Sequence, residues 1–159
     1  MTPTIERGRQ RPADVERLLG ELPDWFGMPE SNANYVAEAA HLPTLTALDG
    51  DTVVGVCLLR EHNPESVEIE LLAVTPDRHR GGIGRALVDA VEDDLRTRGV
   101  QLLQVKTFGP SGHSEPYERT RAFYLAVGFV PLEERTDIWG PDNPCLILVK
   151  PLETAGQPG

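Results

Sequence analysis

The fold is decided by one stretch of the chain, residues 72–87, which reads LAVTPDRHRGGIGRAL. Its apolar start completes a strand-like run that begins at Val67 and is closed by Pro76. Its end opens the run 84–98, whose apolar residues recur at helical spacing. The segment is therefore predicted to be a strand, a tight glycine-rich turn and a helix.

The turn contains Gly81, Gly82 and Gly84, so backbone N–H groups can converge there without obstruction from a Cβ. At a helix N-terminus such donors, together with the positive end of the helix dipole, favour phosphate oxygens. Positive charge could be added by the arginines of the loop, Arg78, Arg80 and Arg85. A glycine-rich turn that holds no ligand remains the alternative at this point.

Two known phosphate-binding loops do not fit. A dinucleotide-binding fingerprint needs a small residue three positions after Gly84, where Leu87 stands, and an acidic residue about 20 positions on, where Leu102 and Leu103 lie. A P-loop needs Gly-Lys-Ser/Thr, and no lysine follows these glycines. Dehydrogenases and NTPases that use these loops are excluded.

Working outward, the patterns predict the order β-α-α-β-β-β-α-β-α-β-β, an α+β fold with a mixed sheet. The pair Asp49-Gly50 indicates a hairpin, and Ser31 or Asn32 is expected to cap the second helix. The predicted elements are strand 4–8, helix 13–21, a helix from 31 or 32 to 40, strands 45–48, 52–60 and 67–74, helix 84–98, strand 100–108, helix 119–127, and strands 129–132 and 145–149.

The chain has 159 residues, which suits a single domain, expected over 1–153. The polar tail 154–159 is expected to be disordered.

The formal net charge of −10 argues against a general nucleic-acid binder and is compatible with cationic substrates such as amines. There is no apolar run of membrane-spanning length and no apolar signal core near the N-terminus, so we expect a cytoplasmic protein with no membrane partner. Cys57 and Cys145 lack metal or redox spacing, so we expect buried thiols and no metal.

The segment 72–87 resembles the acyl-CoA signature of the GNAT superfamily of acetyltransferases, which is Gln or Arg, two residues, Gly, one residue, then Gly or Ala. A second segment, 121–129, reads RAFYLAVGF and resembles the Tyr-containing helix of that family, which ends in Gly-Phe. The predicted element order agrees with the GNAT fold over nearly the whole chain, with a mostly antiparallel central sheet flanked by helices. Two positions depart from the pattern: His79 stands in place of Gln or Arg, and Tyr117 where many members carry Asn.

The resemblance implies acetyl-CoA as cosubstrate and direct acetyl transfer to a primary amine. It places the oxyanion-facing backbone N–H at Leu72, and Ala73 and Val74 along the pantetheine arm. The pyrophosphate would be held by the loop residues His79, Arg80, Gly81, Gly82, Ile83, Gly84 and Arg85. Since neither motif contains cysteine, a covalent acyl-enzyme is disfavoured.

The resemblance also assigns reacting side chains. Strand alternation predicts that Glu68, Glu70, Leu72 and Val74 share one face. Glu68 matches the general base of the histone-acetylating branch, and Glu70 an acidic residue of other members; as an alternative, both carboxylates simply face solvent. Tyr124 matches the tyrosine that gives a proton or a hydrogen bond to the coenzyme A sulfur, a plausible role for a phenol. Its alternative role is helix packing.

Several regions stay open. The loop 109–117 is either part of the acceptor wall, through His113, Glu115 and Tyr117, or a plain connector. The aromatic residues of 25–29 are expected to pack in the core or a lid. His41 and His62 show no partner spacing and are interpreted as ordinary surface or boundary residues.

The competing function is a non-catalytic acyl-CoA binder or sensor. The acceptor is open: it could be a small molecule, a peptide or a protein amine, and transfer to a hydroxyl is also open. A homodimer is possible.

Overall fold

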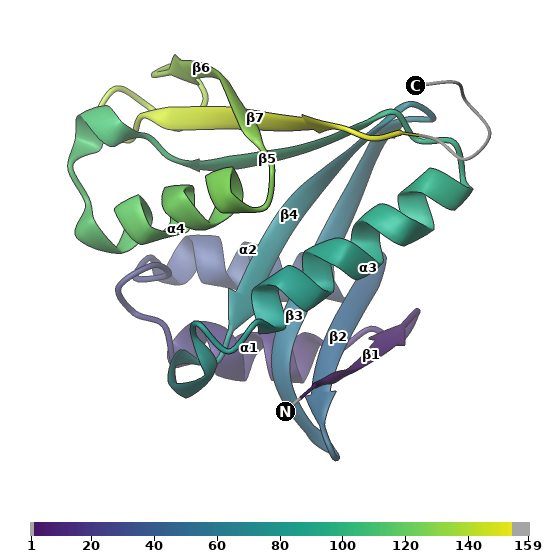
Figure 1. Cartoon of the computed structure of the whole chain (residues 1–159). Helices are drawn as coiled ribbons and strands as arrows, with labels where there is room; N and C mark the ends of the chain where they lie inside the picture. The colour runs from purple at the N-terminus through teal and green to yellow at the C-terminus, as the bar shows by residue number, and fades with distance from the viewer. Residues whose placement is uncertain (1, 154–159) are drawn as a thin grey trace. The chain divides into compact units, whose positions relative to one another are not determined.

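A computed structural model describes residues 2–153. It contains β1 Thr4–Arg7, α1 Pro12–Gly20, α2 Pro29–Ala39, β2 Thr44–Asp49, β3 Thr52–Asn63, β4 Ser66–Val74, α3 Ile83–Thr97, β5 Leu102–Phe108, α4 Glu115–Ala126, β6 Val130–Arg135 and β7 Cys145–Pro151, with short 3-10 turns at Pro76–Arg78 and Pro110–Gly112 (Figure 1). The seven strands follow the order β1-β2-β3-β4-β5-β7-β6 in a mixed, mostly antiparallel sheet. The predicted fold class and element order are confirmed.

The chain divides into two compact units. The first consists of the chain up to Arg60 together with Ile69–Asp94, and the second of Glu61–Glu68 together with the chain from Leu95. The single domain over 1–153 therefore stays a prediction, and the expected disordered tail, 154–159, lies outside the described residues.

The first unit has helices on both faces of its strands. Val56 of β3 is buried in a cluster with residues of α1 and with Ala39 of α2. At the preceding position, Gly55, a Cβ would lie 2.9 Å from Ile83 Cγ2 and 3.1 Å from Leu87 Cδ1, both on α3. The face of β3 opposite to Val56 is therefore packed against α3. In Figure 1, α3 correspondingly passes in front of β2 and β3, and α1 lies behind them. A glycine at position 55 is what lets α3 approach the strand so closely.

The beginning of α2 differs from the prediction. The helix begins at Pro29, with Met28 as its N-cap and no capping side chain, so Ser31 and Asn32 lie within the first turn. Proline fits the first helical position because its missing N–H would have no partner there. Asn32 instead donates its side-chain amide to the carbonyl of Phe26, 2.8 Å away.

The hairpin at Asp49-Gly50 is confirmed: Asp49 pairs with Thr52, and Gly50 has φ +61°.

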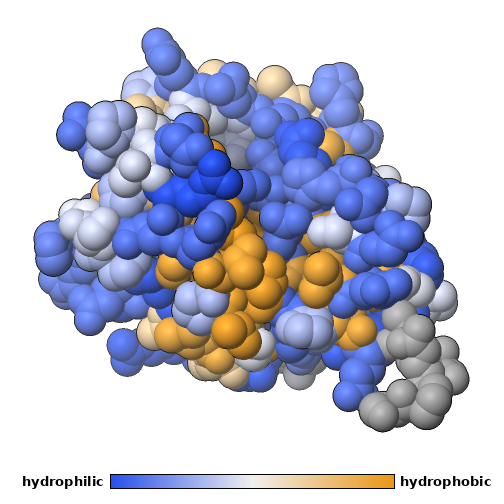
Figure 2. All heavy atoms as spheres, turned by 90° about the horizontal axis from the view of Figure 1, so that it is seen from above, coloured by the Kyte–Doolittle hydropathy of each residue, from blue (hydrophilic) through white to orange (hydrophobic). Residues whose placement is uncertain are grey.

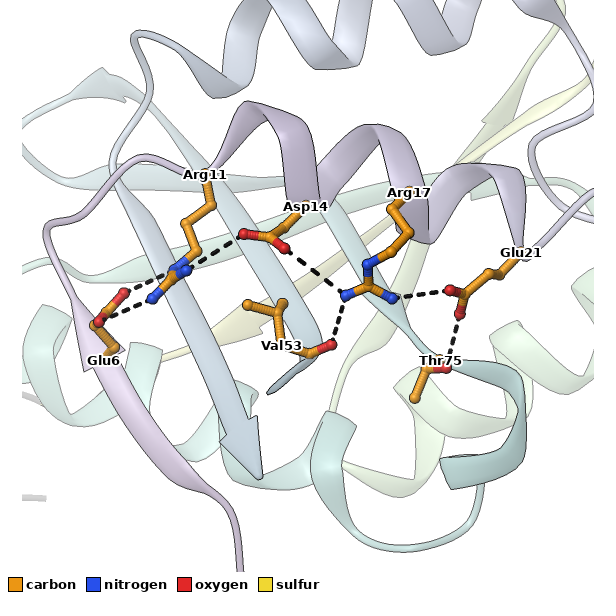
Figure 3. A network of polar contacts seen from close by, with 7 residues as sticks. All are labelled: Glu6, Arg11, Asp14, Arg17, Glu21, Val53 and Thr75. Carbon is orange, nitrogen blue, oxygen red and sulfur yellow. Dashed lines mark hydrogen bonds and ion pairs between the residues drawn. The ribbon is translucent and has the colours of Figure 1, made fainter. Parts of the chain in front are cut away.

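A polar network ties α1 to the end of β4 (Figure 3). Arg17 donates to the carbonyl of Val53 and to Glu21, both at 2.8 Å, and the other oxygen of Glu21 accepts the Thr75 hydroxyl at 2.8 Å. Thr75 is the first residue after β4, so this chain of contacts holds the strand end from which the glycine loop departs. The same network continues along α1 through Asp14 and Arg11 to Glu6.

In the second unit, α4 packs beside β5 (Figure 1). Its Tyr124 is buried. The helix begins at Glu115, four residues before the predicted start at 119. The reason is a cap that the apolar pattern does not reveal: Ser114 Oγ accepts the Tyr117 N–H at 3.5 Å, and Pro116 fits the first turn.

Strand β6 lies at the edge of the sheet and is exposed along its whole length. It presents Val130 and Leu132 to solvent, at 56% and 62% exposure, and hydrophobic residues reach the surface among the hydrophilic ones in Figure 2. Pro131 and the charged residues after Leu132 discourage pairing with another strand, a common protection of sheet edges. A shift of register between Pro131 and Glu133 adds to this irregularity.

Both cysteines are fully buried free thiols, as predicted. Burial raises the pKa of Cys57 to about 12 and that of Cys145 to about 11. Over residues 2–153 no helix is long and apolar enough to cross a membrane, and that part of the chain brings together no group of three or more potential metal ligands.

Candidate acyl-CoA site

The glycine loop links β4 to α3 through a tight, exposed turn. The N–H of Gly81 donates to the carbonyl of Arg78 at 3.1 Å, and a Cβ on Gly81 would also lie 3.1 Å from that oxygen. Gly82 has φ +82°, and the bond from Ala86 N–H to its carbonyl, at 2.9 Å, belongs to the first turn of α3. The first N–H groups of a helix have no partner within it, so the exposed backbone here can receive an anion.

The side chains of the glycine loop offer fewer groups for binding an anion than its backbone does. Arg78 forms an ion pair with Asp49, so its charge is balanced within the first unit. Ile83 is buried against β3, which leaves its backbone N–H as the group available to a ligand. Arg80 is exposed and adopts φ +68°, a left-handed conformation that is uncommon for a residue with a Cβ. The turn thus has left-handed backbone at both position 80 and position 82.

His79, the residue that departs from the family signature, is bound to its own loop. Its Nε2 lies 2.8 Å from the carbonyl oxygen of Val74, and its ring meets Trp25 edge-on with centroids 5.4 Å apart. Because a carbonyl only accepts, Nε2 carries the proton in this contact. The imidazole therefore fastens the turn to the end of β4, a role that the sequence alone did not suggest.

Replacing Gly82 by alanine is expected to lower the free energy of unfolding by about 1 kcal/mol, because a Cβ is unfavourable in left-handed backbone. No atom would clash with the new methyl group, so the cost is conformational. Gly20→Ala is the matched control: it also meets open space, and its φ is not positive. Urea unfolding measures both, and equal stability of the two variants would contradict this conformation of the loop.

The residues at the end of β4 differ in their burial. Leu72 and Val74 are half-buried, whereas Ala73 is 3% exposed and belongs to the core cluster shared with α1 and α2. Only the backbone of Ala73 can therefore line a ligand. The carbonyl of Val74 is already the acceptor for His79.

Glu70 is held by Arg60, whose Nε donates to it at 3.0 Å, and Arg60 also pairs with Glu38 of α2 at 3.3 Å. Its neighbour Leu71 packs in the core cluster with α1 and α2. From Ile69 to Val74, buried and half-buried residues alternate along β4, as expected of a regular strand whose consecutive side chains point to opposite faces. Neither predicted carboxylate is merely a solvent-facing strand residue.

Glu68 is almost fully buried, at 5% exposure. Its Oε1 accepts Lys106 Nζ at 2.8 Å and lies 2.6 Å from His62 Nε2. His62 is exposed, which agrees with its interpretation as a surface or boundary residue, but its spacing did not reveal Glu68 as a partner. The partner was missed because β3 was expected to end at Arg60, whereas the strand runs to Asn63 and brings His62 beside β4.

Tyr124 is 5% exposed and sits between two aromatic rings. The centroid of its ring lies 5.3 Å from that of Phe123 and 5.4 Å from that of Phe129, both in edge-on contacts. The N–H of Phe129 also donates to the Tyr124 carbonyl at 3.0 Å. The ring is thus fixed by packing, as the helix-packing interpretation requires, and this leaves a chemical role for the hydroxyl untested.

The loop 109–117 is ordered by contacts within the second unit. The N–H and hydroxyl of Ser111 donate to Glu134 Oε1 at 3.1 and 2.7 Å, and His113 adopts φ +55°. The Tyr117 ring packs against Phe108 with centroids 5.5 Å apart, and burial raises the pKa of its phenol. Of the three candidate contact residues of the loop, His113 and Glu115 are exposed, whereas Tyr117 is half-buried.

The residues of the glycine loop fit a ligand that carries phosphate groups. The loop offers an exposed backbone with glycines at 81, 82 and 84, and a Cβ at Gly82 would occupy open space beside that backbone. The N-terminus of α3, a helix that runs Ile83–Thr97, supplies the positive end of a helix dipole, which favours a negatively charged ligand. This donor set suits the pyrophosphate of an acyl-CoA better than a neutral ligand.

Comparison with known proteins agrees with this interpretation. The model of the acetyltransferase (GNAT) family matches residues 12–129. Over 90 residues the chain is 47% identical to the mycothiol acetyltransferase of Acidimicrobium ferrooxidans, covering 55% of this chain and 26% of that protein. The chain spans only about a quarter of the length of the mycothiol acetyltransferases that it matches. It is 28% identical over 162 residues to the IAA acetyltransferase of Azospirillum brasilense, covering 94% and 99%.

Solved structures share the fold. An acetyltransferase of the GNAT family from Desulfovibrio desulfuricans superposes with a TM-score of 0.82 at 21% identity, covering 95% of this chain and 99% of that one. A GNAT family acetyltransferase from Elizabethkingia anophelis with acetyl-CoA bound has a TM-score of 0.70 at 20% identity, covering 95% and 99%. At these identities the likeness concerns the fold alone.

Proposed function

Because the chain belongs to the acetyltransferase (GNAT) family, we propose that it transfers the acetyl group of acetyl-CoA to a primary amine by direct attack. The observation that carries the proposal is the glycine loop, which joins β4 to α3 with exposed backbone at Gly81 and Gly82. The binding residues are then those of the loop, 79–85, and the backbone of 72–74. Acetyl-CoA supplies an acetyl carbon activated as a thioester.

The chain's own groups have three tasks in this reaction. Backbone donors bind the negative charge that develops on the carbonyl oxygen, and we assign the Leu72 N–H to this task. Glu68 in the first place, and Glu70 in the second, are assigned to the removal of the proton that the acceptor ammonium must lose before it can attack, either directly or through a neighbouring group. Tyr124 gives a proton to the departing sulfur. The nitrogen–carbon bond forms as the carbon–sulfur bond breaks, and the electron pair of the broken bond stays with sulfur. The second proton that nitrogen loses on becoming an amide replaces the one that Tyr124 gave to sulfur.

The acceptor is defined only by class, as a small-molecule or peptide amine. The acidic balance of the chain, with 25 Asp and Glu against 15 Lys and Arg, supports a cationic acceptor. Aminoglycosides, polyamines, amino acids, peptide N-termini and protein lysines all meet this description. A cytoplasmic location and a homodimer remain proposals alongside it.

Acetyl-CoA is expected to stabilise the protein against thermal unfolding. A specific ligand at 100 times its dissociation constant adds about 2.7 kcal/mol to the free energy of unfolding, which raises the melting temperature measurably. Differential scanning fluorimetry with acetyl-CoA, and with acetate as a control for unspecific effects, measures this shift. A melting temperature that stays constant up to millimolar acetyl-CoA would remove the cosubstrate assignment.

A further inference from the structure

Three polar side chains from three strands meet around a single oxygen atom. Glu68 on β4 places Oε1 2.8 Å from Lys106 Nζ on β5 and 2.6 Å from His62 Nε2 on β3. The side chains are 6%, 24% and 37% exposed for Glu68, Lys106 and His62, respectively. The carboxylate is thus the inner member of the group, and the imidazole is its most accessible member.

The contacts determine which imidazole nitrogen carries a proton. An ionised carboxylate can only accept hydrogen bonds, and the ammonium of Lys106 on the same oxygen favours the ionised form. His62 therefore donates from Nε2 to Glu68. In the neutral ring this leaves Nδ1 with a lone pair, which can accept a proton.

The same contacts make Glu68 a poor direct acceptor for a proton from substrate. Its Oε1 already receives two donors, and little of the side chain is exposed. An ammonium that approaches this group from solvent meets the imidazole more readily than the carboxylate. A histidine held by a carboxylate through one nitrogen, with the other nitrogen open, is an arrangement suited to general-base catalysis.

We propose that Nδ1 of His62 is the atom that takes the proton from the acceptor amine, and that Glu68 acts through it as a positioning residue. This inference rests on the proposed acetyl transfer. The N–H bond of the ammonium breaks and its electron pair stays on nitrogen, while the proton joins the lone pair of Nδ1 and gives an imidazolium. The freed electron pair then forms the bond to the acetyl carbon, and the imidazolium later returns its proton to solvent.

Charged and titratable groups from several strands lie around His62. Glu68 and Lys106 contact the group directly, and Glu61, the preceding residue, pairs with Arg98 at 3.1 Å. The buried thiol of Cys145 lies close enough to both Lys106 and Glu68 for their charges to affect its pKa. The positive charge gained by His62 would therefore be stabilised by the carboxylate of Glu68 and opposed by the ammonium of Lys106.

The kinetic test replaces His62 by glutamine and uses His41→Gln as the matched control, since His41 is an exposed histidine of the first unit. His62→Gln is expected to lower kcat about 100-fold, the lower end of what a general base contributes, and to leave the Michaelis constant for acetyl-CoA nearly unchanged. The acidic limb of the pH–rate profile should disappear, and added imidazole should restore part of the rate. Turnover of His62→Gln equal to that of His41→Gln would overturn the proposal while leaving acetyl transfer intact.

A second readout does not depend on turnover. Long-range 1H–15N NMR reports which nitrogen of each of the four histidines is protonated, and the His62→Gln spectrum identifies the signals of position 62. We expect a neutral His62 with its proton on Nε2, and a mixture of tautomers in Glu68→Gln. A proton on Nδ1 in the wild-type protein would overturn the proposal even if no acceptor had been found. The absence of turnover in the wild type on every amine would instead count against the proposed function.

Discussion

Tyr124→Phe is expected to lower kcat about 100-fold and to leave the affinity for acetyl-CoA nearly unchanged, because the substitution removes the hydroxyl that is proposed to give a proton to sulfur. The ring itself is held by Phe123 and Phe129, at 5.3 and 5.4 Å between centroids, and phenylalanine can keep both contacts. The fold should therefore persist, and a fall in rate would report the hydroxyl rather than the packing.

The control is Tyr35→Phe. Tyr35 lies in the first unit, where its ring meets Phe26 edge-on at 6.0 Å, and it has no assigned part in binding or chemistry. Steady-state kinetics with calorimetric binding of acetyl-CoA distinguishes the two variants. A Tyr124→Phe protein that turns over as fast as the Tyr35→Phe protein would exclude Tyr124 from the chemistry and leave it a packing residue.

Glu68→Ala is expected to lower the free energy of unfolding by about 2 to 3 kcal/mol, as well as to reduce turnover. Removing one partner of a buried ion pair leaves the other charge without compensation, which costs about 3 to 5 kcal/mol when both are fully buried. Lys106 is 24% exposed here, so water relieves part of that cost. Loss of the hydrogen bond from His62 adds to the effect.

Glu61→Ala provides the comparison, since it removes the carboxylate of an ion pair in the same unit. Its pair with Arg98 has side chains 53% and 50% exposed, and such pairs contribute at most about 1 kcal/mol. Urea unfolding followed by circular dichroism measures both variants. Equal stability of Glu68→Ala and Glu61→Ala would show that Glu68 is not buried among charges as described.

Most of the fold could be predicted from local sequence patterns. The residue types from Val67 to Leu87 alone predict a strand, a glycine turn and a helix, and the Asp49-Gly50 pair predicts a hairpin in the same local way. Helix starts were less predictable. The apolar pattern of α2 does not reveal that Pro29 begins it, and that of α4 does not reveal the Ser114 cap.

The polar group around Glu68 could be predicted only in part. Glu68 was identified from the family resemblance, but Lys106 lies 38 residues away and meets it through the pairing of strands, which no local spacing encodes. The position of His62 beside β4 could have been predicted from one local feature. Pro64 and Glu65 form a tight two-residue turn, so the residues just before the turn lie opposite the beginning of β4. Ending β3 at Arg60 concealed that feature.

The most direct test of the central claim is amine-dependent release of thiol from acetyl-CoA by the wild-type protein, with the acetylated product identified by mass spectrometry. A panel of aminoglycosides, polyamines, amino acids, peptides and lysine-containing proteins covers the acceptor classes. The account predicts thiol release that requires a primary amine and matches the N-acetyl product one to one. Binding of acetyl-CoA without turnover on any amine of the panel would contradict it and favour a non-catalytic acyl-CoA binder.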